Sequence, residues 1–137
     1  MHEGWINADK LPWVDGVITF DFDKEALVSR FGESVFDEIL CKGCIIEFIK
    51  NPIEVMSEFH DACQNNAIVT IITAVVDNGD GVFRDPTAKR YLRSDWIDYI
   101  AGSRKMGGYG FGVRGAFELV SNQVSGEVQT VVFRVKK

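Results

Sequence analysis

The chain has 137 residues, 46% of them hydrophobic and 26% charged, and a formal net charge of −5. This composition excludes a disordered chain and a small scaffold held together by disulfides, and the length is typical of one domain. We therefore expect a single globular domain over residues 1–137. The acidic balance disfavours a nucleic-acid partner, because binding to phosphates needs many Lys and Arg contacts, and it favours a basic protein partner.

Three features bear on where the protein works. The longest apolar run, residues 67–76, is about half of what a membrane-spanning helix needs. The N-terminus carries Glu3 where a secretory signal has basic residues, and no apolar stretch follows it. Three cysteines, an odd number, suit a reducing compartment. Together these features predict a cytoplasmic protein with no membrane segment.

The first half of the chain predicts strands and helices in alternation. Residues 17–23 alternate apolar and polar side chains, as in a half-buried strand. Apolar residues at helical spacing predict a helix over 24–41, in which Gly32 is either tolerated or divides the helix in two. A buried strand over 44–50 and a helix over 52–64, capped by Asn51, follow.

The second half begins with residues 67–76, the strongest candidate for a central strand. A third helix is expected over 85–101, and two long β segments, 108–120 and 127–137, are joined through "SNQVSG". The fold class is therefore α/β (α+β mixed), with a strand–helix–strand–helix–strand N-terminal part, a third helix and a C-terminal antiparallel β-hairpin. An exposed edge of that hairpin leaves homo-oligomerisation open.

A set of cysteine and histidine residues has spacing that suits a metal. Cys41, Cys44, His60 and Cys63 follow the pattern C-x2-C-x15-H-x2-C, in which a turn and one helix face could each supply two zinc ligands. The alternative is core packing, because Cys44 begins an apolar stretch, Gly43 suits a helix end, and cysteine is often buried. We favour packing and keep zinc as the second interpretation.

A glycine-rich segment, residues 102–115, combines backbone freedom with aromatic and basic side chains. Such loops often carry binding residues. The candidate binding residues here are Arg104, Lys105, Tyr109, Phe111 and Arg114. They would suit a nucleotide or another small ligand, or a protein partner.

No catalytic residues are proposed from the sequence, and the chain is more readily explained as a binding protein than as an enzyme. His60 has no sequence arrangement of a recognised kind with Ser or Cys. Asp21 and Asp23 share one face of the expected strand, where they could bind a cation or could simply face solvent.

These observations give three hypotheses of function. The first is a small acidic binding protein, of which one concrete version is an inhibitor or immunity-type protein that covers a basic toxin or nuclease. Its candidate surface consists of Glu3, Asp9, Asp15, Asp21, Asp23, Glu25, Glu33 and Asp37. The second is a nucleotide or small-ligand binding protein, or an enzyme on such a ligand, that uses the glycine-rich segment. The third is a zinc-binding interaction module.

Overall fold

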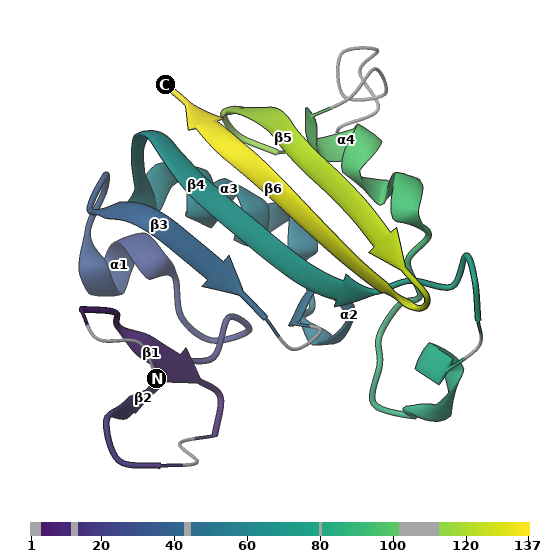
Figure 1. The fold of residues 1–137 in the computed structure, drawn as a ribbon. Helices are drawn as coiled ribbons and strands as arrows, with labels where there is room; N and C mark the ends of the chain where they lie inside the picture. The colour runs from purple at the N-terminus through teal and green to yellow at the C-terminus, as the bar shows by residue number, and fades with distance from the viewer. Residues whose placement is uncertain (1–3, 12–13, 43–44, 80, 102–112) are drawn as a thin grey trace.

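The computed structural model describes residues 4–11, 14–42, 45–79, 81–101 and 113–137. Its centre is a four-stranded sheet in the order β3-β4-β6-β5, made of β3 (Phe36–Cys41), β4 (Cys63–Ala74), β5 (Ala116–Ser125) and β6 (Val128–Lys136). β3 and β4 are parallel, whereas β6 runs antiparallel to both β4 and β5 (Figure 1). The sheet is mixed, and the expected α/β class with a C-terminal antiparallel hairpin is confirmed.

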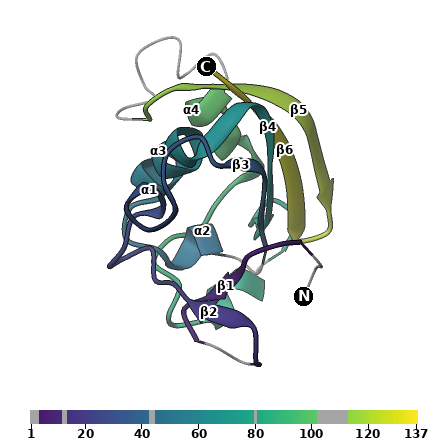
Figure 2. The ribbon, with the colours of Figure 1, turned by 90° about the vertical axis from the view of Figure 1, so that its left-hand side faces the viewer.

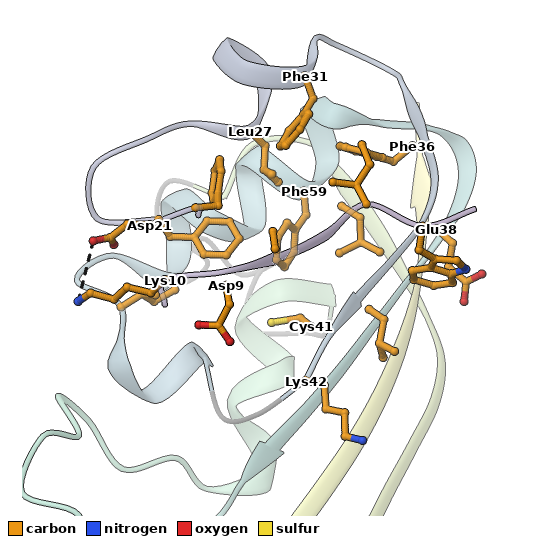
Figure 3. A pocket seen from close by; sticks show the side chains of 18 of the residues that line it. Asp9, Lys10, Asp21, Leu27, Phe31, Phe36, Glu38, Cys41, Lys42 and Phe59 are labelled. Atoms are coloured by element: carbon orange, nitrogen blue, oxygen red, sulfur yellow. Dashed lines mark ion pairs between the residues drawn. The ribbon is translucent and has the colours of Figure 1, made fainter. Parts of the chain in front are cut away.

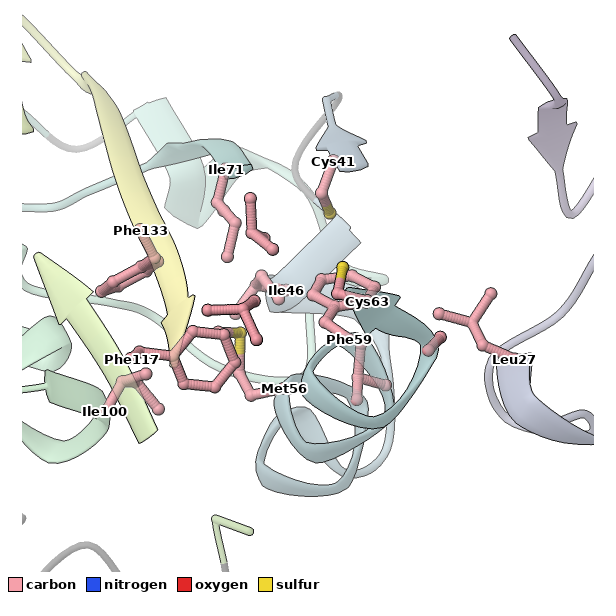
Figure 4. Packing of buried hydrophobic residues seen from close by; sticks show 14 of the residues in the cluster. Leu27, Cys41, Ile46, Met56, Phe59, Cys63, Ile71, Ile100, Phe117 and Phe133 are labelled. Atoms are coloured by element: carbon pink, nitrogen blue, oxygen red, sulfur yellow. The ribbon is translucent and has the colours of Figure 1, made fainter. Parts of the chain in front are cut away.

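Helices cover one face of this sheet (Figure 2). They are α1 (Leu27–Phe31), α2 (Ile45–Phe48), α3 (Pro52–Ala62) and α4 (Asp98–Ala101). Between α3 and the inner sides of β4 and β6 lies the core, where Met56 and Phe59 are buried among Ile71, Val131 and Phe133 (Figure 4). In the described part of the chain, the opposite face of the sheet has no helix over it.

Three smaller parts complete the described chain. Two short strands near the N-terminus, β1 (Asn7–Asp9) and β2 (Val17–Thr19), form a separate parallel pair. Two 3-10 turns, η1 (Gly81–Arg84) and η2 (Ser94–Ile97), lie between β4 and α4. No helix in the described residues is both long and apolar enough to cross a membrane.

α3 forms where local signals agree. The Asn51 side chain accepts a hydrogen bond from the Glu54 amide (3.1 Å), and Pro52 occupies the first turn. Val55, Met56, Phe59 and Ala62 are buried on one face, at the spacing that a helix packed on a sheet requires. The helix predicted over 52–64 is therefore confirmed to within two residues.

The helix predicted over residues 24–41 is wrong beyond Phe31. Gly32 follows α1 with φ of 102°, and Ser34 has φ of 54°, so the chain leaves the helical region there. The segment then becomes β3, in which Ile39 pairs with Val69 and Cys41 with Ile71 of β4. Gly32 is therefore neither tolerated inside a longer helix nor the division between two helices, because it ends α1 and a strand follows.

Four other expected elements differ from the structure, one being the connection "SNQVSG", whose residues 121–125 belong to β5. Of the strand expected over 44–50, the described residues 45–50 do not form one, because α2 occupies Ile45–Phe48 and both Ile46 and Ile49, three positions apart, lie in the core. The strand expected over 17–23 is confined to β2. The helix expected over 85–101 exists only as η2 and α4, and at its predicted start Asp85 accepts hydrogen bonds from Thr87 in a local turn.

Candidate binding cavity

A cavity of about 880 Å³ lies between the N-terminal segment and the β3 side of the sheet (Figure 3). Residues of β1 line one side, and β3 lines the other. Leu27 and Phe31 of α1 and Phe59 of α3 form its inner wall. Its volume falls within the range of sites that hold small ligands or parts of larger ones.

The inner wall of the cavity is largely aromatic. Phe20 lies edge-on to Phe22 with ring centroids 4.9 Å apart, and Phe22 lies edge-on to Phe59 at 5.8 Å. The aromatic lining residues are Trp5, Phe20, Phe22, Phe31, Phe36, Phe48 and Phe59. Such walls favour apolar groups, and the ring faces also attract cations.

β3 presents its edge to the cavity. Every residue from Val35 to Lys42 lines it, eight in succession. Successive side chains of a strand point to opposite faces of a sheet, so a cavity that touched one face alone would meet every second residue. The cavity therefore follows the side of the β3 backbone that faces away from β4. In the sheet as described, β3 is a terminal strand with β4 beside it.

The charged residues around the cavity are mainly acidic. Five carboxylates line it, from Asp9, Asp21, Asp23, Asp37 and Glu38, together with two ammonium groups, from Lys10 and Lys42. The Lys10 ammonium lies 3.9 Å from Asp21 (Figure 3). Asp37 and Glu38 are exposed, and neither forms an ion pair with another described residue. Their negative charges are therefore not neutralised by a cation of the described residues and can attract a ligand.

Asp23 is held in place by two donors. Its carboxylate accepts hydrogen bonds from the Lys50 amide (2.7 Å) and from the Lys89 ammonium (3.0 Å). The Lys50 amide is the main reason why the pKa of Asp23 is lowered below its ordinary value. The group is therefore ionised at neutral pH and contributes negative charge to the cavity wall.

Of the residues expected to bind, Asp21 and Asp23 both line the cavity. They do so from a turn, in which Asp21 accepts a hydrogen bond from the Asp23 amide (2.9 Å), and not from one face of a strand. Asp37 belonged to the expected acidic surface. Glu38 and the aromatic wall were missed, because residues 36–41 were assigned to a helix and no local pattern indicates that the N-terminal segment lies opposite them.

Arg114 does not supply an available positive charge. Its guanidinium donates to Glu54 (3.0 Å) and Asp61 (3.0 Å), and it lies 4.0 Å from Glu58. The hydrogen bonds with Asp61 and Glu54 raise its pKa. Three carboxylates of α3 thus surround this residue. Arg104, Lys105, Tyr109 and Phe111 lie outside the described residues, so their binding role stays a prediction.

Three of the four predicted zinc ligands do not converge. Cys63 pairs with Phe36 at the start of β3, whereas Cys41 lies at its end, about 16 Å further along the strand. Ligands of one tetrahedral zinc ion must lie about 2.0–2.3 Å from it. The His60 Nε2 lies 2.9 Å from the carbonyl oxygen of Lys136, to which its N–H donates. Cys44 lies outside the described residues.

The buried cysteines instead contribute to packing. Both Cys41 and Cys63 belong to the hydrophobic core (Figure 4), and burial raises the pKa of the Cys63 thiol to about 11. Within the described ranges there is no group of three or more His, Cys, Asp and Glu side chains that could hold a metal ion. The zinc interpretation is corrected accordingly for Cys41, His60 and Cys63.

No protein-family model matches the sequence, and no curated protein matches it. Among solved structures, one from a study of the conversion of a disulfide bond into a thioacetal group during echinomycin biosynthesis aligns with a TM-score of 0.48 and 15% identity, over 76% of this chain and 51% of that one. A mutant of the 16S rRNA (adenine(1408)-N(1))-methyltransferase from Catenulisporales acidiphilia aligns with a TM-score of 0.44 and 11% identity, over 77% of this chain and 52% of that one. The chain spans about half the length of each.

Proposed function

We propose that this chain is a binding protein and that it holds a basic segment of a protein partner in the cavity beside β3. The observation that carries the proposal is the combination of aromatic walls with five lining carboxylates. A Lys or Arg side chain can pack its aliphatic stem on aromatic rings while its charged end stays near a carboxylate. A basic segment with apolar residues would satisfy both parts of the site.

The exposed acids support a protein partner whose charge is complementary. Asp37 and Glu38 stand at the rim with no ion pair to another described residue, so they can attract a basic surface from a distance. An inhibitor or immunity-type protein that covers a basic toxin or nuclease is one concrete form of this function. A nucleotide is a poor ligand for the same cavity, because its phosphates would meet these carboxylates.

Two labelled peptides of opposite charge test the proposal. The first is acetyl-Lys-Val-Lys-Val-Lys-Val-amide, and the second has Glu in place of every Lys. Binding is measured by fluorescence anisotropy between about 50 and 500 mM salt. We expect the lysine peptide to bind, with an affinity that falls as salt rises, and the glutamate peptide not to bind. Equal binding of both peptides, no binding of either, or an affinity that does not change with salt concentration would contradict the proposal.

Matched variants locate the binding site. The double substitution Asp37→Asn and Glu38→Gln should weaken binding of the lysine peptide about tenfold, because each removes a rim charge with little change in side-chain shape. Asp95→Asn is the control, since Asp95 is exposed in η2 and does not line the cavity. The control should bind as the unmodified protein does. An equal loss in both variants would place the interaction elsewhere.

A further inference from the structure

The edge of β3 offers more than charge to a bound segment. We propose that the partner segment adds to the sheet as a further strand, hydrogen-bonded along β3, so that the sheet of four strands becomes one of five. This inference rests on the proposed function and specifies how the segment is held. It assigns the main recognition to the backbone of residues 36–40.

The first step concerns backbone groups. A terminal strand presents alternate N–H and C=O groups on the side that has no neighbouring strand. All residues from Val35 to Lys42 line the cavity, so that side of β3 opens into it along the whole strand. The six residues of β3 extend over about 20 Å, enough to pair with a segment of five or six residues. Adding a strand at such an edge is a recurrent mode of peptide recognition.

The second step concerns the side chains that such a strand would need. Ile39 and Cys41 pair with Val69 and Ile71, whose side chains are buried, so they mark the inner face. Glu38 and Leu40 belong to the opposite face. A strand next to β3 would turn alternate side chains toward the aromatic wall and the others toward the side of Glu38. The expected segment therefore alternates apolar and basic residues.

The third step excludes a second copy of this chain at the same edge. Two copies joined through β3 would bring the Asp37 and Glu38 carboxylates of both chains close together. Like charges across paired strands are unfavourable, and charged side chains on an edge strand are a common defence against such self-association. The same charges favour a basic strand. Charge therefore selects a partner of opposite sign as the occupant.

Backbone N-methylation of the lysine peptide tests strand addition without altering the protein. A strand at an edge points every second N–H toward its neighbour, whereas the other N–H groups point away. One peptide carries N-methyl groups on its three Lys residues, and another carries them on its three Val residues. We expect one of the two to lose about tenfold or more in affinity and the other to lose much less, because only one set donates to β3.

Hydrogen exchange supplies the second measurement. Bound parent peptide should slow the exchange of alternate amides in residues 36–40, those that face the cavity, and leave the amides bonded to β4 little changed. Equal losses from both N-methylated peptides, or no added protection in β3, would overturn strand addition while leaving charge-driven binding intact. Failure of the parent lysine peptide to bind would instead contradict the proposed function itself.

Discussion

The carboxylate of Glu47 in α2 accepts a hydrogen bond from the backbone amide of Ala74 at the end of β4, at 2.8 Å. Glu47 is 1% exposed, so this bond joins two elements inside the protein. It explains why a charged residue occurs in the middle of the apolar run of residues 44–49. The amide at the end of β4 would otherwise be left without this acceptor in a partly buried position.

Replacing Glu47 with alanine should destabilise the fold. Glu47→Ala removes the acceptor for the Ala74 amide and opens a cavity, so we expect a loss of about 2–4 kcal/mol in the free energy of unfolding. Glu47→Gln keeps an acceptor oxygen and should cost clearly less. Urea denaturation at neutral pH measures both. If the two variants unfolded at the same urea concentration, the hydrogen bond would not be the source of the stability.

Gly115 should not accept a side chain. Its φ is 79°, a region that favours glycine, and a Cβ atom there would clash with the ring of His60. Gly115→Ala should therefore lower the stability by about 2 kcal/mol or more. Gly126→Ala is the matched control, because Gly126 has φ of 60° but nothing near the added atom. Thermal unfolding should show a larger decrease in Tm for Gly115→Ala, and an equal decrease would refute the clash.

Burial of Cys63 should make the stability depend on pH in the alkaline range. Its thiol pKa is raised from 9.0 to about 11 in the folded protein, so its contribution is complete below pH 9 and is lost as pH rises through 11. The expected loss in the free energy of unfolding reaches about 2–3 kcal/mol. Because lysines and tyrosines also titrate there, the measurement is the difference between the unmodified protein and Cys63→Ala. Parallel pH profiles would contradict the prediction.

Asp77 should contribute to stability above acid pH. Its carboxylate accepts hydrogen bonds from the Ser94 amide (2.7 Å) and hydroxyl (2.8 Å), and these hold its pKa below the ordinary value of 3.8. The contribution is therefore present above pH 3.8 and is lost as pH falls through the lower folded value. Asp77→Asn should lose part of this contribution at neutral pH. Its free energy of unfolding, measured by urea denaturation, should depend less steeply on pH in the acid range. A slope in Asp77→Asn equal to that of the unmodified protein would refute the assignment.

The sequence allowed α3 and the central strand to be predicted because their signals are local. Asn51 and Pro52 mark the start of α3. Residues 67–76 are apolar except for Thr70 and Thr73, a pattern that predicts a buried strand whichever strands lie beside it. The mixed α/β class and the C-terminal hairpin were also predicted correctly, whereas β1 and α2 were not predicted and the strand before α3 was placed at residues 44–50. What failed was the assignment of residues 36–41, whose apolar spacing suits a helix as well as a strand. Only the pairing of β3 with β4 decides between them.

The candidate cavity could be predicted only in part, for a related reason. The acidic character of the first half of the chain is visible in the sequence, and Asp9, Asp21, Asp23 and Asp37 belong to both the expected surface and the cavity. Their common position beside the edge of β3 depends on contacts between segments distant along the chain. The zinc pattern was misleading because residues with suitable spacing in the sequence need not meet in the fold. Cys41 and Cys63 lie at opposite ends of the β3–β4 pair.

The irregularity in β5 has a consequence for how the hairpin tolerates changes in length. Leu119 pairs with Phe133 and Ser121 with Val132, so Val120 is an extra residue in the ladder. Beyond it, Asn122 occupies the inner face and accepts a hydrogen bond from Gln129, whose side-chain oxygen accepts one from the Trp96 indole. Deleting Val120 would leave these pairings in place and make the ladder regular, because the residues on either side of it already face consecutive residues of β6. The hairpin should therefore accept a β5 shorter by this one residue, since the contact of Asn122 with Gln129, and through it with Trp96, depends on the pairing beyond Val120.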